Sequence, residues 1–132
     1  PGTSFINDAG YTLNIPDLNC PPGAAVLTRV ISHPKEGYFT LDLGYKGIAA
    51  DPPGQRGYIV GLEDAEQVMQ NEEHWVWRLK DLSRVPRIGT CLYVIPTHIC
   101  PTSMLYPEVL IAQDGSIVDH WQVTARNRKL NY

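Results

Sequence analysis

The stretch "WVWRLK", residues 75–80, indicates how this chain folds. Its large apolar residues Trp75, Trp77 and Leu79 alternate with residues that are smaller or charged. This period of two is typical of a β-strand that has one face against a core and the other toward solvent. The stretch therefore predicts a half-buried strand with both tryptophans pointing inward.

Six more stretches of this kind surround it. They are short and rich in β-branched or aromatic residues, and they cover residues 24–32, 38–44, 56–62, 90–96, 108–113 and 116–125. Turn sequences separate them, such as "HPKEG" (33–37) and "QDGS" (113–116), whose Asp-Gly pair favours the positive φ angles of tight hairpins. Seven short strands with regular turns predict an all-β domain, with a barrel favoured over a sandwich.

Helices should be few and short, because 11 glycines and 11 prolines interrupt a chain of 132 residues. Residues 62–70 fit a helix about as well as a strand, and a short helical turn is expected at residues 100–105. The opening "PGTSFINDAGY" reads as a strand-like run and as part of a longer protein. We expect four residues in the core or at an interface, namely Trp75, Trp77, Val94 and Val118.

Composition narrows the class of protein. The length suits one domain, and the net charge of -3 comes without a basic stripe, so nucleic-acid binding is not expected. The basic residues of 125–130 read as a solvated tail. No apolar run approaches the ~18 residues of a membrane span, so no membrane partner is expected. The three widely spaced cysteines, Cys20, Cys91 and Cys100, favour the reducing cytoplasm over a disulfide framework.

The stretch "IPTHICPTSM", residues 95–104, offers a candidate metal site. On an extended backbone His98 and Cys100 would point to the same side, between the stiffening Pro96 and Pro101. Imidazole nitrogen and thiolate sulfur are ligands that Zn²⁺ prefers. Two ligands do not complete a site, however, and a lone His/Cys pair is often just packing. If a metal does bind, its open positions are those of a catalytic metal.

Two other stretches carry polar candidates. In "QNEEHWVW" (70–77), His74 beside Glu72 and Glu73 suits acid/base chemistry, or else a solvated loop at the start of a strand. In "LDLGYKGIAAD" (41–51), Lys46 could contact an anion or lie exposed in a turn. No G-x-S-x-G nucleophile motif and no glycine-rich phosphate loop occur.

Several of these stretches together resemble a known family. "PGTSFINDAG", "AAVLTRVIS", "LDLGYKGIAAD", "NEEHWVW" and "IPTHICPTSMLY…VLIAQDGSIVDHWQVTARNR" follow in order the C-terminal domain of the D-threonine aldolase and D-serine dehydratase family. These are pyridoxal-phosphate enzymes with the architecture of alanine racemase. The resemblance implies that residues 1–132 form the C-terminal β-barrel domain of a two-domain enzyme, whose N-terminal (β/α)8 barrel lies outside this chain.

The resemblance also implies a function. His98 and Cys100 would be the protein ligands of a catalytic Zn²⁺ or Mn²⁺, and the cysteine, where the aldolases tend to carry aspartate, favours a dehydratase. The full-length enzyme would be a homodimeric lyase acting on a D-amino acid such as D-serine or D-threonine. Pyridoxal phosphate would be bound by the barrel, and this chain alone would be inactive. Lys46 and His74 match recurring motifs and are expected, as catalytic candidates, at the mouth of the active site.

Two alternatives to this lyase remain open. One is a relative of the amino-acid racemases in which the His98 and Cys100 pair is vestigial, so that removal of metal would leave activity unchanged. The other is a non-catalytic, stand-alone β module whose loop binds zinc loosely or not at all.

Overall fold

A computed structural model describes residues 3–130 of the chain and confirms the all-β prediction. The elements in chain order are η1 Thr3–Phe5, α1 Ala9–Asn14, η2 Pro16–Leu18, β1 Val26–Ser32, β2 Tyr38–Leu41, β3 Gly57–Ile59, β4 Glu66–Gln70, β5 Trp75–Arg78, η3 Leu82–Arg84, β6 Cys91–Pro96, α2 Ile99–Ser103, β7 Glu108–Gln113, β8 Ser116–Gln122 and η4 Thr124–Arg126. All seven expected strands are present. The ambiguous residues 62–70 contain strand β4, and the helical turn expected near residue 100 is α2.

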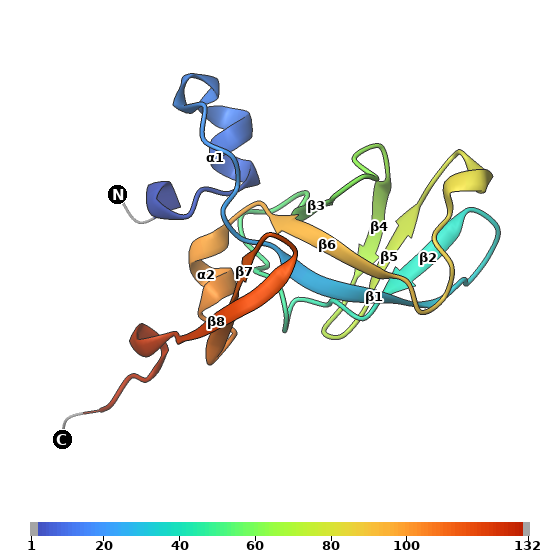
Figure 1. Cartoon of the computed structure of the whole chain (residues 1–132). Helices are drawn as coiled ribbons and strands as arrows, with labels where there is room; N and C mark the ends of the chain where they lie inside the picture. The colour runs from blue at the N-terminus through green and yellow to red at the C-terminus, as the bar shows by residue number, and fades with distance from the viewer. Residues whose placement is uncertain (1–2, 131–132) are drawn as a thin grey trace.

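Six strands form one curled antiparallel sheet in the order β3-β6-β1-β2-β5-β4, and β7 and β8 form a separate hairpin (Figure 1). Pairing is well defined along the centre of the sheet, where Val26 of β1 lies opposite Val94 of β6, and Leu41 of β2 lies opposite Trp75 of β5. Because strand side chains alternate, this register brings the apolar residues of neighbouring strands to the same concave side.

The core lies inside the curl. Trp75 and Trp77 are 0% and 1% exposed, as the alternation predicted, and their ring centroids lie 4.6 Å apart with planes tilted by 49°. Tilted aromatic pairs of this kind contribute about 0.5–1.5 kcal/mol beyond the burial of their surface. Phe39, Leu41 and Val94 pack in the same cluster and are fully buried. The expectation for Val94 is therefore confirmed.

The opening of the chain differs from its prediction. Residues 3–14 form η1 and α1 instead of a strand-like run. The physical reason is the cap: the Asp8 side chain accepts a hydrogen bond from the backbone N–H of Tyr11, which satisfies a free donor of the first helical turn. The helix ends at Asn14 because Ile15 precedes Pro16, and a residue before proline disfavours helical geometry.

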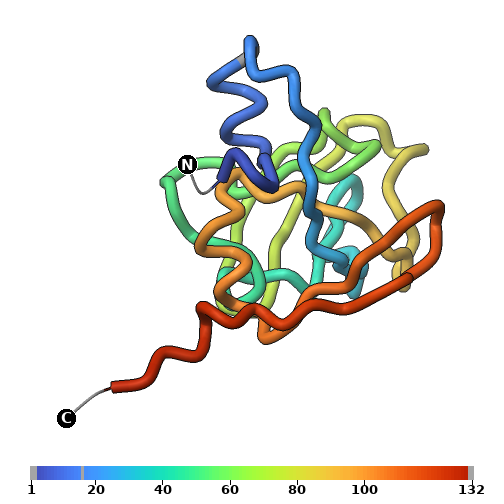
Figure 2. The backbone as a smooth tube through the Cα atoms, turned by 60° about the vertical axis from the view of Figure 1, so that its left-hand side comes forward, coloured from blue at the N-terminus to red at the C-terminus, as the bar shows by residue number. Residues whose placement is uncertain are grey.

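The β7–β8 hairpin lies apart from the core. Its turn has Asp114 at φ 50° and Gly115 at φ 77°, which are the positive angles expected of the Asp-Gly pair. Val118 in β8 is 56% exposed, so it does not pack in the core of the described chain, and an interface role for it remains a prediction. The period-two pattern is present in this hairpin, but no second layer of the described chain covers it. Figure 2 shows the segment after the hairpin leaving the body of the molecule, in line with the expected solvated tail.

A search of the described residues for membrane-spanning segments finds no helix with the length and apolar character that crossing a bilayer requires. The longest described helix, α1, has six residues.

Candidate metal site

His98 and Cys100 lie where β6 gives way to α2. His98 is the N-cap residue of α2 with an extended backbone (φ −135°, ψ 102°), and the helix begins at Ile99. Cys100 is therefore helical, and the expectation of an extended backbone through both residues is wrong. Pro101 does not prevent this, because proline is tolerated in a first helical turn, where its missing N–H would have no partner. Whether the two side chains share a metal remains a prediction.

His98 has one ring nitrogen engaged and the other available. Its Nδ1 lies 3.2 Å from Oδ2 of Asp51, and its side chain is 37% exposed. Nε2 makes no hydrogen bond to any other described residue. A neutral imidazole that donates through Nδ1–H presents a lone pair at Nε2, which is the form that binds a metal.

Cys100 is a free cysteine with an exposed side chain. Its Sγ lies 2.9 Å from Oγ1 of Thr3, which is buried. Either atom can be the donor in this contact, and the deprotonated sulfur is the form in which cysteine binds metals. The N-terminal segment, 97 positions away in the chain, therefore meets the candidate ligand directly.

Asp8 fixes the N-terminal segment to this loop. It is 1% exposed, its Oδ2 accepts the N–H of Ile99 at 2.8 Å, and its Oδ1 accepts the N–H of Tyr11 at 2.9 Å. Gly10 donates its N–H to the carbonyl of Thr97 at 3.1 Å, and α1 and α2 lie at the same end of the molecule (Figure 1). Sequence reasoning missed Asp8. The available signal was an aspartate directly before a short run without proline, which is an N-cap pattern.

Thr102 fixes the loop from the other side. It is 1% exposed, and its Oγ1 donates to the carbonyl of His98 at 2.8 Å and accepts the N–H of Ala49 at 3.1 Å. A second hydrogen bond joins the loop of His98 to the segment that carries Asp51, because the hydroxyl of Thr97 donates to the carbonyl of Gln55 at 2.7 Å. The loop bearing His98 is thus joined to the N-terminal segment and to residues 49–55.

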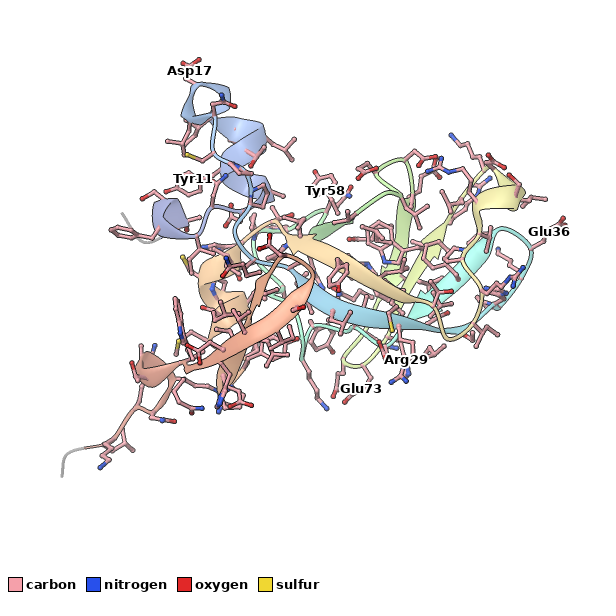
Figure 3. All side chains as sticks on the ribbon, in the orientation of Figure 1. Tyr11, Asp17, Arg29, Glu36, Tyr58 and Glu73 are labelled. Carbon is pink, nitrogen blue, oxygen red and sulfur yellow. The ribbon has the colours of Figure 1, made fainter. Side chains whose placement is uncertain are left out.

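An open cleft of about 390 Å³ lies beside His98. Its lining comes from α1, from the loop at Asp51 and from Thr97 and His98. Tyr11, which lines this cleft, projects from α1 in Figure 3. His98 is therefore accessible to a small ligand on the side where α1 faces the sheet.

Lys46 and His74 belong to two loops that contact each other and are separate from the loop of His98 and Cys100. The Lys46 Nζ lies 2.7 Å from Oε1 of Glu73 and 2.9 Å from Oε2 of Glu72. The hydrogen bonds to Glu73 and then to Glu72, followed by the negative charges of the two carboxylates, raise the pKa of Lys46 above its ordinary value. The Lys46 hydrogen bond and charge lower the pKa of Glu73. Figure 3 shows Glu73 on a different side of the molecule from Tyr11, whose helix borders the cleft.

The backbone explains this pairing. The N–H of Lys46 donates to the carbonyl of Glu72, and a Cβ at Gly44 would lie 2.1 Å from the Glu72 carbonyl carbon. Glycine at position 44 therefore allows the two loops to touch. His74 is exposed, and its backbone N–H donates to Oδ1 of Asn71. No contact between described side chains joins Lys46 or His74 to His98 or Cys100, and their catalytic role remains a prediction.

The donor set fits zinc but is incomplete. Within residues 3–130, no group of three or more His, Cys, Asp or Glu side chains is placed to hold an ion. His98 and Cys100 offer one nitrogen and one sulfur, the ligand types that Zn²⁺ prefers. Any ion held by this pair would take its other ligands from outside the described residues or from solvent.

Comparison with known proteins shows the family. The model of the putative serine dehydratase domain matches residues 23–112, which is more than half of the chain. The chain belongs to this family. A D-threonine aldolase of an Arthrobacter species is 32% identical to this domain over 103 residues, covering 76% of the chain but 26% of the aldolase. An uncharacterized protein of Mycobacterium tuberculosis is 30% identical over 115 residues, covering 85% of the chain and 86% of that protein.

Solved structures share the fold of this serine dehydratase-family domain. D-threonine aldolase from Filomicrobium marinum superposes with a TM-score of 0.85 over 96% of the chain, at 23% identity and 35% coverage of the aldolase. An alanine racemase-like protein from Idiomarina loihiensis gives 0.61 at 27% identity, covering 74% of the chain and 30% of that protein. The resemblance deduced from the sequence is therefore confirmed for family and fold. The domain spans about a quarter to a third of these enzymes.

Proposed function

We propose that this domain supplies the metal ligands of a pyridoxal-phosphate-dependent lyase that acts on β-hydroxy-D-amino acids. The observation that carries the proposal is that one loop, held in place by buried Asp8 and Thr102, bears both His98, whose Nε2 bonds no other described residue, and the exposed Cys100. Membership of the serine dehydratase family, whose named relatives include a D-threonine aldolase and a 3-hydroxy-D-aspartate aldolase, gives the reaction class.

A structural relative supports the assignment of the ligands. D-threo-3-hydroxyaspartate dehydratase, which shares the fold at a TM-score of 0.65, has been solved with a histidine replaced by alanine. It has also been solved with a cysteine two positions further along replaced by alanine, in a metal-free form. His98 and Cys100 have the same spacing and order in this chain.

Each residue then has a defined task. His98 would bind the metal through Nε2 and Cys100 through Sγ, which the Thr3 hydroxyl contacts. The metal, Zn²⁺ in preference to Mn²⁺ because thiolate is a soft ligand, would supply Lewis-acid chemistry at this loop. Pyridoxal phosphate, bound outside this chain, would supply the electron sink for the reaction. The family resemblance, in which the aldolases tend to carry aspartate at the position of Cys100, supports a dehydratase over an aldolase.

The test uses the full-length protein that carries this domain. It is incubated with D-serine and with D-threonine, with and without a chelator, and 2-oxo acid and glycine are quantified. We expect chelator-sensitive formation of 2-oxo acid that Cys100→Ala abolishes and Cys91→Ala, at another exposed cysteine, leaves intact. Glycine with an aldehyde would make the enzyme an aldolase using the same site. Full turnover of Cys100→Ala would contradict the metal assignment, and racemisation insensitive to the chelator would favour the racemase alternative.

A second candidate has its own support. The match to the Mycobacterium tuberculosis protein covers 86% of that protein, so the same domain there makes up a chain of about this length. A domain of this family can therefore be nearly a whole protein, and a free-standing metal-binding module is the second proposal. The intact mass of the native gene product separates the two candidates, because the lyase requires a chain about three times longer.

A further inference from the structure

We infer that Asp51 is a positioning residue that orients the His98 ring for metal binding. The inference rests on the proposed function, in which His98 is a ligand. Asp51 lies in the loop after β2, and its Oδ2 approaches Nδ1 of His98 at 3.2 Å. Metal-binding histidines commonly donate their second ring N–H to a carboxylate, which fixes the tautomer and the ring orientation.

The contact with Asp51 gives the two ring nitrogens of His98 different roles. A carboxylate can only accept, so Nδ1 carries a proton in this contact, and in the neutral ring Nε2 then has the lone pair that a metal requires. Without Asp51 the ring could turn about its side-chain bonds, or exchange tautomers, and present the wrong atom. The negative charge beside Nδ1–H also makes Nε2 a stronger donor to a cation.

Both ends of this contact are anchored to one buried residue. The Thr102 hydroxyl holds the carbonyl of His98 and the N–H of Ala49, two positions before Asp51. The backbones on either side of the contact are therefore fixed with respect to each other. The Asp51 side chain itself is 63% exposed, so the preorganisation comes from its backbone and not from burial.

The solvent exposure of the Asp51–His98 pair distinguishes a positioning role of Asp51 from a role in the stability of the fold. A solvent-exposed pair contributes little to the stability of a fold. Removal of the Asp51 carboxylate should therefore leave folding unchanged and weaken metal binding. If Asp51 were instead a direct ligand of the metal, binding would require its charged carboxylate oxygen. The substitution Asp51→Asn would keep an amide oxygen that can still accept the Nδ1–H but is a much poorer metal ligand.

The experiment measures metal binding by the full-length protein that carries this domain. Zn²⁺ affinity is determined by competition with a chromophoric chelator, and Co²⁺ titration follows the thiolate-to-metal absorption for which Cys100 is responsible. We expect Asp51→Ala to weaken Zn²⁺ binding by about 10- to 100-fold and Asp51→Asn by clearly less. Asp64→Ala, which removes an exposed aspartate paired with Arg84, serves as the control and should bind like wild type. Urea unfolding should be the same for all three variants.

The outcomes are distinguishable. If wild type and Cys100→Ala bind Zn²⁺ equally or not at all, the proposed function fails and the inference falls with it. If Cys100→Ala loses binding but Asp51→Ala retains wild-type affinity, the role of Asp51 is overturned while the metal site stands. Equal losses in Asp51→Ala and Asp51→Asn would make Asp51 a ligand in place of a positioning residue.

Discussion

Asp8 and Ile99 lie 91 positions apart, and the Asp8 carboxylate accepts the backbone N–H of Ile99 at 2.8 Å. The other oxygen of the same carboxylate caps α1 at Tyr11. The first turns of two helices thus share one buried acceptor. Helix N-termini have unpaired N–H groups and a partial positive charge, so they stabilise a carboxylate that is almost fully buried. The conformation of the candidate metal loop therefore depends on the opposite end of the chain.

Replacement of Asp8 by alanine should be among the more damaging single changes in this domain. It would leave the buried N–H of Ile99 and the part-buried N–H of Tyr11 without their acceptor, and an unsatisfied buried group costs about 1–3 kcal/mol. We expect the free energy of unfolding, measured by urea denaturation, to fall by about 2–4 kcal/mol on these magnitudes. Asp8→Asn keeps one acceptor oxygen and should lie between wild type and alanine.

The matched control is Asp17→Ala, which changes an exposed aspartate of the same N-terminal segment. Its effect should stay within about 0.5 kcal/mol, as is usual at the surface. A similar loss in both variants would mean that the shared cap between α1 and α2 is not what Asp8 contributes.

Gly10→Ala should destabilise the domain although the residue is helical. Alanine in a helix interior is normally favoured over glycine by about 0.5–1 kcal/mol. Here, a Cβ would lie 2.4 Å from the carbonyl oxygen of Thr97, so α1 would have to move away from the loop. We expect a net loss of about 1–3 kcal/mol, typical of forced overpacking, in urea denaturation. Leu13→Ala, on the exposed side of α1, is the control, and a gain of stability in Gly10→Ala would refute the close approach.

The strands could be predicted from the sequence because their signal is local. Trp75, Trp77 and Val94 follow the alternation of their own strands, and the sheet places them inside. Helix α1 could not be recognised in the same way, because six residues with a glycine show no helical periodicity and the stabilising contact of Asp8 reaches Ile99. Long-range hydrogen bonds of this kind leave no pattern in the sequence around them.

The candidate site also has a part that the sequence predicts and a part that it does not. The metal-binding chemistry of His98 and Cys100 can be predicted from residue type and spacing. The contacts that hold them, from Thr3, Asp8 and Asp51, come from distant segments and depend on the folded backbone. The extended backbone predicted through Cys100 is wrong because Pro101 does not stiffen a strand here but lies within the first turn of α2.

Two valines that the strand alternation predicts in the core or at an interface have opposite environments in the structure. Val94 is fully buried beneath the sheet, whereas Val118 is 56% exposed in the hairpin. Val94→Ala should cost about 2 kcal/mol or more, because two buried methyl groups are lost and a cavity remains. Val118→Ala, the same chemical change, should cost less than about 0.5 kcal/mol in the isolated chain. The measurement is chemical denaturation of both variants, and equal costs would mean that the hairpin packs in the chain in solution.

The ion pairs of Lys46 give a pH-dependent prediction. The hydrogen bond and charge of Lys46 depress the pKa of Glu73 in the folded state, so this pairing stabilises the fold above the ordinary glutamate pKa. The contribution is lost as the pH falls through the depressed value. The raised pKa of Lys46 keeps the ammonium charged throughout this acid range. The stability difference between wild type and Lys46→Met should therefore be present at neutral pH and shrink in acid.

An NMR titration of the Glu73 carboxyl measures the cause directly. In Lys46→Met we expect its pKa to return toward the ordinary value of 4.5. Lys35→Met is the control, because Lys35 lies over the ring of Tyr38 and does not contact Glu73. An unchanged Glu73 pKa in Lys46→Met would show that the pair does not persist in solution. An ammonium bound by two carboxylates has little capacity left to bind a substrate. Without that pairing, Lys46 would be free for the role at the active-site mouth that the family resemblance implies.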